Sequence, residues 1–322
     1  MHRHVAVDPE LVGAEWSRWR DVVRAQFGAV NGRWIADFPE KEWKQRVRDA
    51  AKAAKEAGKL KRVKFDTIIN DLQKENFLVP CNEVFRSEDI SWIEAARETQ
   101  REDHHWDAVL TTEVEDLAAR IYSFENVEYT QTGLELPRTL VAKTEAGLLE
   151  FVSSLLQYSA QVRFVDPNFK PGEPRFQEVT HSLLNQAYEG VKPKRCEYHL
   201  EDKMGPKEFK DNLYAFFHGE VPPTTFVRWK RIEPKDKAES MHSRYILTER
   251  GGVGIDFGLD AEPEVETDQT TDVHRIDFAL RTERWNQFCP QKGTFEFVDA
   301  WIVDDKGVKQ ADRHKNKFRV VN

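Results

Sequence analysis

Cysteine is scarce in this chain of 322 residues, which contains only Cys81, Cys196 and Cys289. Their odd number and wide spacing exclude a disulfide framework and a zinc ribbon. No stretch of 18 apolar residues occurs, and the first residues lack the apolar core of a signal peptide. We therefore expect reduced cysteines, no transmembrane segment and a location in the cytoplasm.

Clustered metal ligands are also scarce. His104 and His105 stand side by side between Asp103 and Asp107. Adjacent side chains diverge on a helix and oppose each other on a strand, so these two histidines are poorly placed to hold one ion. We expect neither a metal nor another cofactor in this protein.

Positive charge is in deficit overall but is unevenly distributed. The net charge of -8 disfavours a uniformly basic nucleic-acid-binding protein, yet residues 41–64 contain ten lysines and arginines against three acidic residues. One interpretation is a nucleic-acid-binding strip that includes Lys52, Lys55, Lys59 and Arg62. The other is the solvated face of a long helix, and the sequence leaves both open.

Apolar positions recur at helical spacing between about residues 10 and 60, and residues 63–73 and 91–102 show the pattern of further helices. Residues 106–116 begin as a strand. We therefore expect a helix-rich N-terminal domain over residues 1–125. Turn residues and threonines over residues 126–144 predict a linker or an entry strand.

Residues 145–322 alternate between helical patterns and short apolar runs. A helix is predicted over 145–159, a strand over 162–167 and a second helix over 175–190. This order is typical of an α/β layer structure, so the predicted fold class is α/β, with a mixed sheet flanked by helices. Further apolar runs lie at 196–200, 224–232, 243–249, 253–259, 274–280, 294–304 and 318–322, with a helix over 206–219.

The sequence MHSRYILTER at residues 241–250 contains the chemically most informative pattern. His242, Arg244 and Glu249 follow the spacing H-x-R-x4-E, and two glycines come next. Residues 242 and 244 of a strand point to the same face, so an imidazole and a guanidinium could converge on one phosphate. Glu249 is a candidate to orient His242 or to pair with Arg244. The alternative is that all three are ordinary residues of a strand and its turn.

This spacing resembles the H-x-K-x4-D motif of the phospholipase D superfamily, with arginine in place of lysine and glutamate in place of aspartate. The sequence VRFVDPNFKPGEPRF at residues 162–176 is similar to the start of such domains, and the resemblance covers about residues 137–322. It implies a phospholipase D-like fold in which His242 attacks phosphorus, Arg244 neutralises the phosphate oxygens and no metal takes part. The reaction needs two histidines, so one motif per chain implies a homodimer with a shared site.

A second resemblance implies a different function. The sequence HSRYILTERGGVGIDFGLD, followed by HRIDFAL, resembles the phospholipase D-like C-terminal domain of MIT-domain proteins and its prokaryotic relatives. In that family the domain lacks the complete catalytic pair and is implicated in binding acidic phospholipids and in dimerisation. If the site were formed within one chain, His274 would be the remaining candidate for a second histidine.

Three other residues are predicted to contact phosphate. Asp166 ends a strand, where open α/β sheets place ligand contacts, although it could equally cap a turn. Arg175 begins the next predicted helix, and Lys230 lies in the basic run RWKR.

We expect a phosphodiesterase or nuclease that acts on nucleic acid. The resemblance implies the role of effector or accessory in a prokaryotic antiviral defence system, with an ATPase or another defence-complex protein as partner. The alternative is a non-catalytic module that binds the phosphate of nucleic acid or phospholipid within an assembly.

Overall fold

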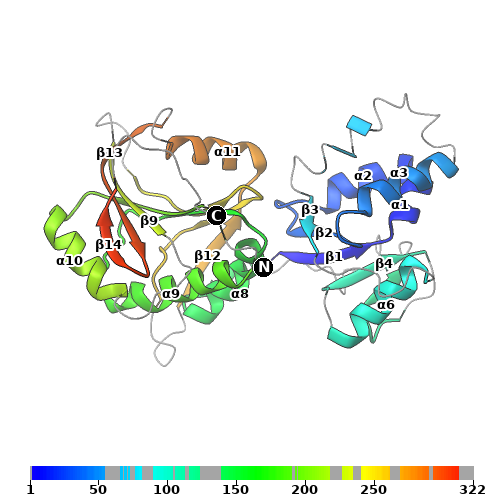
Figure 1. Ribbon diagram of the computed structural model, residues 1–322, viewed down its shortest axis with the longest axis horizontal. Coiled ribbons are helices and arrows are strands. Elements are labelled where there is room, and N and C mark those ends of the chain that lie inside the picture. The colour runs from blue at the N-terminus through cyan, green and yellow to red at the C-terminus, as the bar shows by residue number, and fades with distance from the viewer. Residues whose placement is uncertain are drawn as a thin grey trace. The chain divides into compact units, whose positions relative to one another are not determined.

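The computed structural model divides the chain into two compact units (Figure 1), His2–Pro137 and Arg138–Asn322. The division falls inside residues 126–144, the segment predicted as a linker or entry strand. The residues that the structure describes are 2–54, 66–67, 69–70, 72, 77–81, 90–103, 106–112, 116–123, 139–190, 193, 195–217, 227–234, 241–261, 269–289 and 293–311.

The N-terminal unit contains a five-stranded sheet with the strand order β3-β2-β1-β4-β5. Every neighbouring pair of these strands is parallel. The elements are β1 (Arg3–Val7), α1 (Pro9–Ala14), α2 (Trp16–Gln26), β2 (Arg33–Asp37), α3 (Trp43–Ala53), β3 (Leu78–Pro80), α6 (Trp92–Asp103), β4 (Ala108–Thr111) and β5 (Ile121–Ser123).

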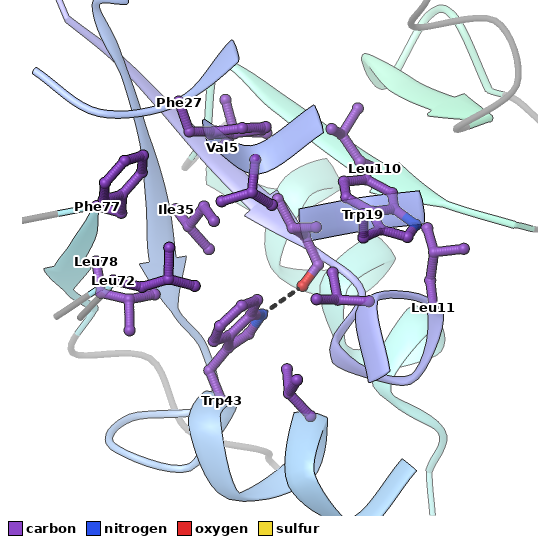
Figure 2. Packing of buried hydrophobic residues seen from close by; sticks show 14 of the residues in the cluster. Val5, Leu11, Trp19, Phe27, Ile35, Trp43, Leu72, Phe77, Leu78 and Leu110 are labelled. Atoms are coloured by element: carbon purple, nitrogen blue, oxygen red, sulfur yellow. Dashed lines mark hydrogen bonds between the residues drawn. The ribbon is translucent and has the colours of Figure 1, made fainter. Parts of the chain in front are cut away.

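Helices cover both faces of this sheet. On one face, side chains of α1, α2 and α3 form a single apolar cluster with β1 and β2. Figure 2 shows Leu11, Trp19 and Trp43 converging on Val5 and Ile35. The Trp43 indole also donates a hydrogen bond to the carbonyl that ends β1, at 2.7 Å. On the other face, aromatic residues of α6 and of the loops pack in a second cluster.

The parallel sheet was missed by the prediction of a helix-rich N-terminal domain. Strands that are covered on both faces lack the alternation of apolar and polar residues that marks a half-exposed strand. Here β1 and β2 are five residues long and β4 is four, and all three are almost wholly buried. Only β2 lies within the residues that show helical spacing, whereas β1 precedes them and β4 coincides with the strand expected from residue 106.

The C-terminal unit is built on a nine-stranded mixed sheet with the order β14-β13-β9-β8-β7-β10-β11-β12-β6. The central strands β7, β8 and β9 are parallel, and the other neighbours are antiparallel. The elements are β6 (Leu140–Ala142), α8 (Glu145–Gln157), β7 (Gln161–Val165), α9 (Pro174–Glu189), β8 (Arg195–Glu201), α10 (Pro206–Phe217), β9 (Val227–Pro234), β10 (Arg244–Thr248), β11 (Gly252–Ile255), β12 (Thr270–Arg275), α11 (Phe278–Gln287), β13 (Phe295–Asp304) and β14 (Gly307–Gln310).

The two faces of the mixed sheet have different coverings (Figure 1). Helices α8 and α9 lie on one side and α11 on the other. Phe164, Tyr198 and Trp229 point to the α9 side and form an aromatic stack there with Phe169. Because strand side chains alternate, the neighbouring residues of the same strands face α11.

The predicted α/β class is confirmed, and most predicted runs of the C-terminal unit coincide with strands or helices. The run at 274–280 is an exception. It holds the end of β12 and the start of α11, where the Asp277 side chain caps the helix by accepting the Leu280 N–H at 2.7 Å. The run at 318–322 lies outside the described residues. In the part of the chain that the structure describes, every helix is too short or too polar to cross a membrane.

Candidate phosphate-binding site

Arg244 is the first residue of β10. Its Nη1 donates a hydrogen bond to the Asp256 carbonyl at 2.9 Å, and its Nε lies 3.9 Å from Asp166 Oδ1. The Nε atom is buried and has no hydrogen-bond acceptor among the described residues. The side chain as a whole is 23% exposed. The guanidinium therefore reaches solvent, and its one hydrogen bond to the described residues leaves Nη N–H groups for a ligand.

Asp166 follows the last residue of β7 and is fully buried. Its Oδ1 accepts the Asn168 N–H at 2.9 Å, and its Oδ2 accepts the Leu259 N–H at 2.8 Å. Burial raises the pKa of Asp166, against the opposing effect of these two hydrogen bonds and of Arg244. The two N–H groups fix the Asp166 carboxylate in the turn, and its burial leaves it no exposed surface.

A second carboxylate brings two more cations to this end of the sheet. Asp260 Oδ2 lies 3.2 Å from Arg175 Nη1 and 3.4 Å from Lys143 Nζ. Arg175 also pairs with Glu173 at 2.9 Å, and Lys170 pairs with the same glutamate at 2.7 Å. We call this group of five residues the Arg244 cluster: Arg244, Asp166, Asp260, Arg175 and Lys143.

Among the described ion pairs of this region, cations outnumber carboxylates. Including the flanking pair of Lys170 and Glu173, four cations face three carboxylates. A phosphate at the exposed side of Arg244 would offset this excess.

The turn beside Asp166, Asp260 and Arg244 requires glycine at position 258. Its φ of +109° belongs to the left-handed region, which side chains other than glycine rarely adopt. A Cβ on Gly258 would lie 2.8 Å from Asp260 Oδ1, 3.3 Å from Asp166 Oδ2 and 3.6 Å from Arg244 Nε. Close approach and backbone conformation therefore both demand glycine in this turn.

We expect Gly258→Ala to lower the free energy of unfolding by about 1–3 kcal/mol, through backbone strain and displacement of the two carboxylates. Gly205→Ala is the matched control, because a Cβ on Gly205 would meet no atom within 4 Å. Urea unfolding of both variants measures the difference. Equal stability of the two variants would contradict the tight turn.

The histidines do not form a pair around Arg244. His242 is exposed and lies before β10, in the segment that enters the strand. His274 of β12 pairs with Gly254 of β11, and Gly254 pairs in turn with Tyr245 of β10. The Tyr245 side chain packs in the core on the α11 side of the sheet. Arg244 alternates with Tyr245 and so points to the other face. The structure therefore separates His274 from Arg244.

Glu249 lies beyond the opposite end of β10. At about 3.4 Å per strand residue, it is on the order of 17 Å along the chain from Arg244. Its two carboxylate oxygens accept the N–H groups of Ala160 and Gln161, each at 2.8 Å. The structure therefore gives Glu249 a role at the start of β7 and does not bring it to His242 or Arg244.

Lys230 is also placed away from the Arg244 cluster, which corrects its prediction as a phosphate-binding residue. It is 2% exposed and faces α11, with Nζ 2.7 Å from Glu197 Oε1. Burial lowers the pKa of Lys230 to about 8, although Glu197 opposes this effect. Glu197 also contacts Arg163 at 3.1 Å and His199 at 3.2 Å, both fully buried. Lys230 thus belongs to a buried charge cluster centred on Glu197.

Of the predicted basic strip, the described part is largely paired with acidic residues. Lys52 contacts Asp49 at 2.9 Å, and Arg46 contacts Glu42 at 3.2 Å. The groove between α1 and α3 has a volume of about 870 Å³ and is lined by Glu10, Glu42 and Asp49 among others. In the described part of residues 41–64, α3 therefore presents paired charges of both signs. Lys55, Lys59 and Arg62 lie outside the described residues, as do His104 and His105.

Sequence reasoning missed the contribution of Lys143 to the site. This lysine lies in the segment predicted as a linker or entry strand, and it reaches Asp260 across a separation of 117 residues. No local pattern encodes such a contact, whereas the strand pairing of β6 with β12 produces it directly.

Comparisons with known proteins add no identification. No protein-family model matches this chain, and no curated protein matches it.

Proposed function

We propose that the C-terminal unit is a non-catalytic module that binds a phosphate group at the Arg244 cluster. The shared chemistry is that of a phosphate ester, whether it belongs to a nucleic acid or to an anionic phospholipid. The observation that carries this proposal is the state of Arg244. Its hydrogen bond goes to a neutral carbonyl, and Asp166 is 3.9 Å away. A guanidinium with spare donors matches the oxygens of a phosphate.

Two further features support the proposal. Among the described residues, the cluster pairs three cations with two carboxylates. Gly258 holds the turn in a left-handed backbone conformation that glycine adopts readily. The resemblance to the phospholipase D-like domain of MIT-domain proteins implies the same kind of ligand. A homodimer and a role in an antiviral defence complex beside an ATPase stay predictions.

Phosphodiester cleavage is the second candidate function, and one observation favours it. His242 is exposed and lies two residues from Arg244. The reaction would need a second histidine, and His274 faces the other side of the sheet. Cleavage would therefore depend on His242 of a second copy of the chain.

We expect Arg244→Lys to weaken binding of a fluorescein-labelled oligonucleotide by about 1–3 kcal/mol, because a lysine loses the planar fork. Arg244→Ala should weaken it at least as much. Fluorescence anisotropy, with inorganic phosphate as competitor, measures the change. Lys309→Ala is the control, since Lys309 is 54% exposed on the edge strand β14 of the same sheet. Binding that Arg244→Ala leaves intact would refute the site.

Cleavage is tested in the same samples. The labelled oligonucleotide is incubated with the wild type and with His242→Ala in the presence of a chelator. An intact oligonucleotide in both samples is expected for a binding module. Cleavage by the wild type that disappears in His242→Ala would establish the phosphodiesterase instead.

A further inference from the structure

Phe257 is an exposed aromatic residue at the Arg244 cluster. The side chain is 62% exposed. It stands between Asp256, whose carbonyl accepts the Arg244 hydrogen bond, and Gly258, whose α-carbon lies in the crowded turn. An isolated exposed apolar residue is common on protein surfaces. Its position directly after Asp256, whose carbonyl binds Arg244, makes this one informative.

The backbone on both sides holds the ring in this exposed position. Ile255 and Leu259 are both buried, with exposures of 2% and 0%. The Leu259 N–H is bound to Asp166, and the Asp256 N–H donates to the Asp272 carbonyl at 3.1 Å. The phenyl ring is therefore presented to solvent by a fixed turn between two buried anchors.

An exposed aromatic side chain, one residue after the carbonyl that binds a guanidinium, matches single-stranded nucleic acid. Proteins recognise single strands by stacking unpaired bases on aromatic side chains while cations contact the backbone. A duplex hides the faces of its bases within the stack. A free phosphate or a phospholipid headgroup offers no aromatic plane to the phenyl ring.

We propose that the C-terminal unit binds single-stranded nucleic acid, with one base stacked on Phe257 and the adjoining phosphate held by Arg244. This inference rests on the phosphate binding proposed above and adds the class of ligand. The competing occupant is a membrane surface, into which an exposed phenylalanine could insert. Stacking requires an aromatic plane, whereas insertion requires only apolar bulk, and this difference separates the two.

The test compares Phe257→Leu, Phe257→Ala and Phe257→Trp for binding of a fluorescein-labelled ten-residue oligothymidylate. Leucine keeps apolar bulk and loses the aromatic plane, so Phe257→Leu and Phe257→Ala should both bind about 5- to 100-fold more weakly. Phe257→Trp should bind as tightly as the wild type or more tightly. Tyr214→Ala is the control, because Tyr214 is an aromatic residue of the same unit with 52% exposure. It should leave binding unchanged.

An abasic oligomer of the same length separates this inference from the proposed phosphate binding. The wild type should bind it as weakly as Phe257→Leu binds oligothymidylate. If the wild type binds both oligomers equally and still needs Arg244, the stacking inference fails and phosphate binding stands. If it binds neither oligomer, both fail for nucleic acid. Vesicles with anionic phospholipid complete the test, since binding retained in Phe257→Leu and lost in Phe257→Ala would identify a lipid surface and overturn the inference.

Discussion

Glu197→Gln is expected to cost about 3–5 kcal/mol of unfolding free energy, because it leaves buried cations without their carboxylate. Lys230, Arg163 and Arg195 each contact Glu197 within 3.1 Å, and the first two are at most 3% exposed. The amide has the shape of the carboxylate but carries no charge. Hydrogen–deuterium exchange of the β7–β9 amides measures the effect within the C-terminal unit.

The control for this variant is Glu201→Gln on the same strand. Glu201 pairs with Lys203 at 3.0 Å, but its side chain is 30% exposed, so water screens the pair and its loss should cost at most about 1 kcal/mol. Adding Lys230→Met to Glu197→Gln should recover part of the stability, since one uncompensated cation is removed. Equal exchange in the two single variants would show that Glu197 does not hold the cluster together.

Acidification is expected to destabilise the protein in two stages, and the first stage depends on His199. Burial lowers the pKa of His199 well below its usual value, against the opposing hydrogen bond to Glu197. The unfolded chain takes up a proton at this residue near pH 6.5, whereas the folded chain does not, so unfolding is favoured as the pH falls. The free energy of unfolding should therefore fall as the pH is lowered below about 6.5, by at most about 1.4 kcal/mol per pH unit.

The second stage comes from Glu197. Burial by itself would raise its pKa, but Lys230, His199 and Arg163 outweigh this effect and hold the pKa well below its usual range. Its stabilising contribution is therefore complete above the pKa of an ordinary glutamate and is lost as the pH falls through the lowered value. Urea unfolding at a series of pH values should show the first stage disappear in His199→Asn and persist in His242→Asn. A first stage that persists in His199→Asn would assign it to another group.

The sequence predicted the strands near the Arg244 cluster better than the contacts within it. The predicted runs at 162–167 and 243–249 both contain strands, because each is a short apolar run followed by turn residues, Asp166-Pro167 in one case and Gly251-Gly252 in the other. Their pairing, Tyr245 opposite Val165, brings Arg244 near Asp166 and is a property of the sheet. The spacing of His242, Arg244 and Glu249 does not by itself specify this pairing.

Two predicted site residues show why spacing alone misassigns roles. Glu249 is five residues from Arg244, but an extended strand carries it away, and the nearby Ala160 and Gln161 N–H groups occupy its oxygens. Lys230 lies in a basic run that looks exposed, but β9 is a central strand covered on both faces. Lys230 can be buried because it pairs with Glu197 on the neighbouring strand β8. A local run of the sequence does not reveal this partner.

The edge strand β6 has a practical consequence for dividing the protein. It contributes three residues, pairs with β12 and carries Lys143 toward Asp260 immediately after it. A fragment that starts at residue 145, the domain boundary predicted from the sequence, would lack this strand. It would expose the backbone N–H and C=O groups of β12 as a new sheet edge, on which other copies could add strands and aggregate. A fragment that starts at residue 138 keeps β6 in place. We therefore expect it to be more soluble on expression than the fragment that starts at residue 145.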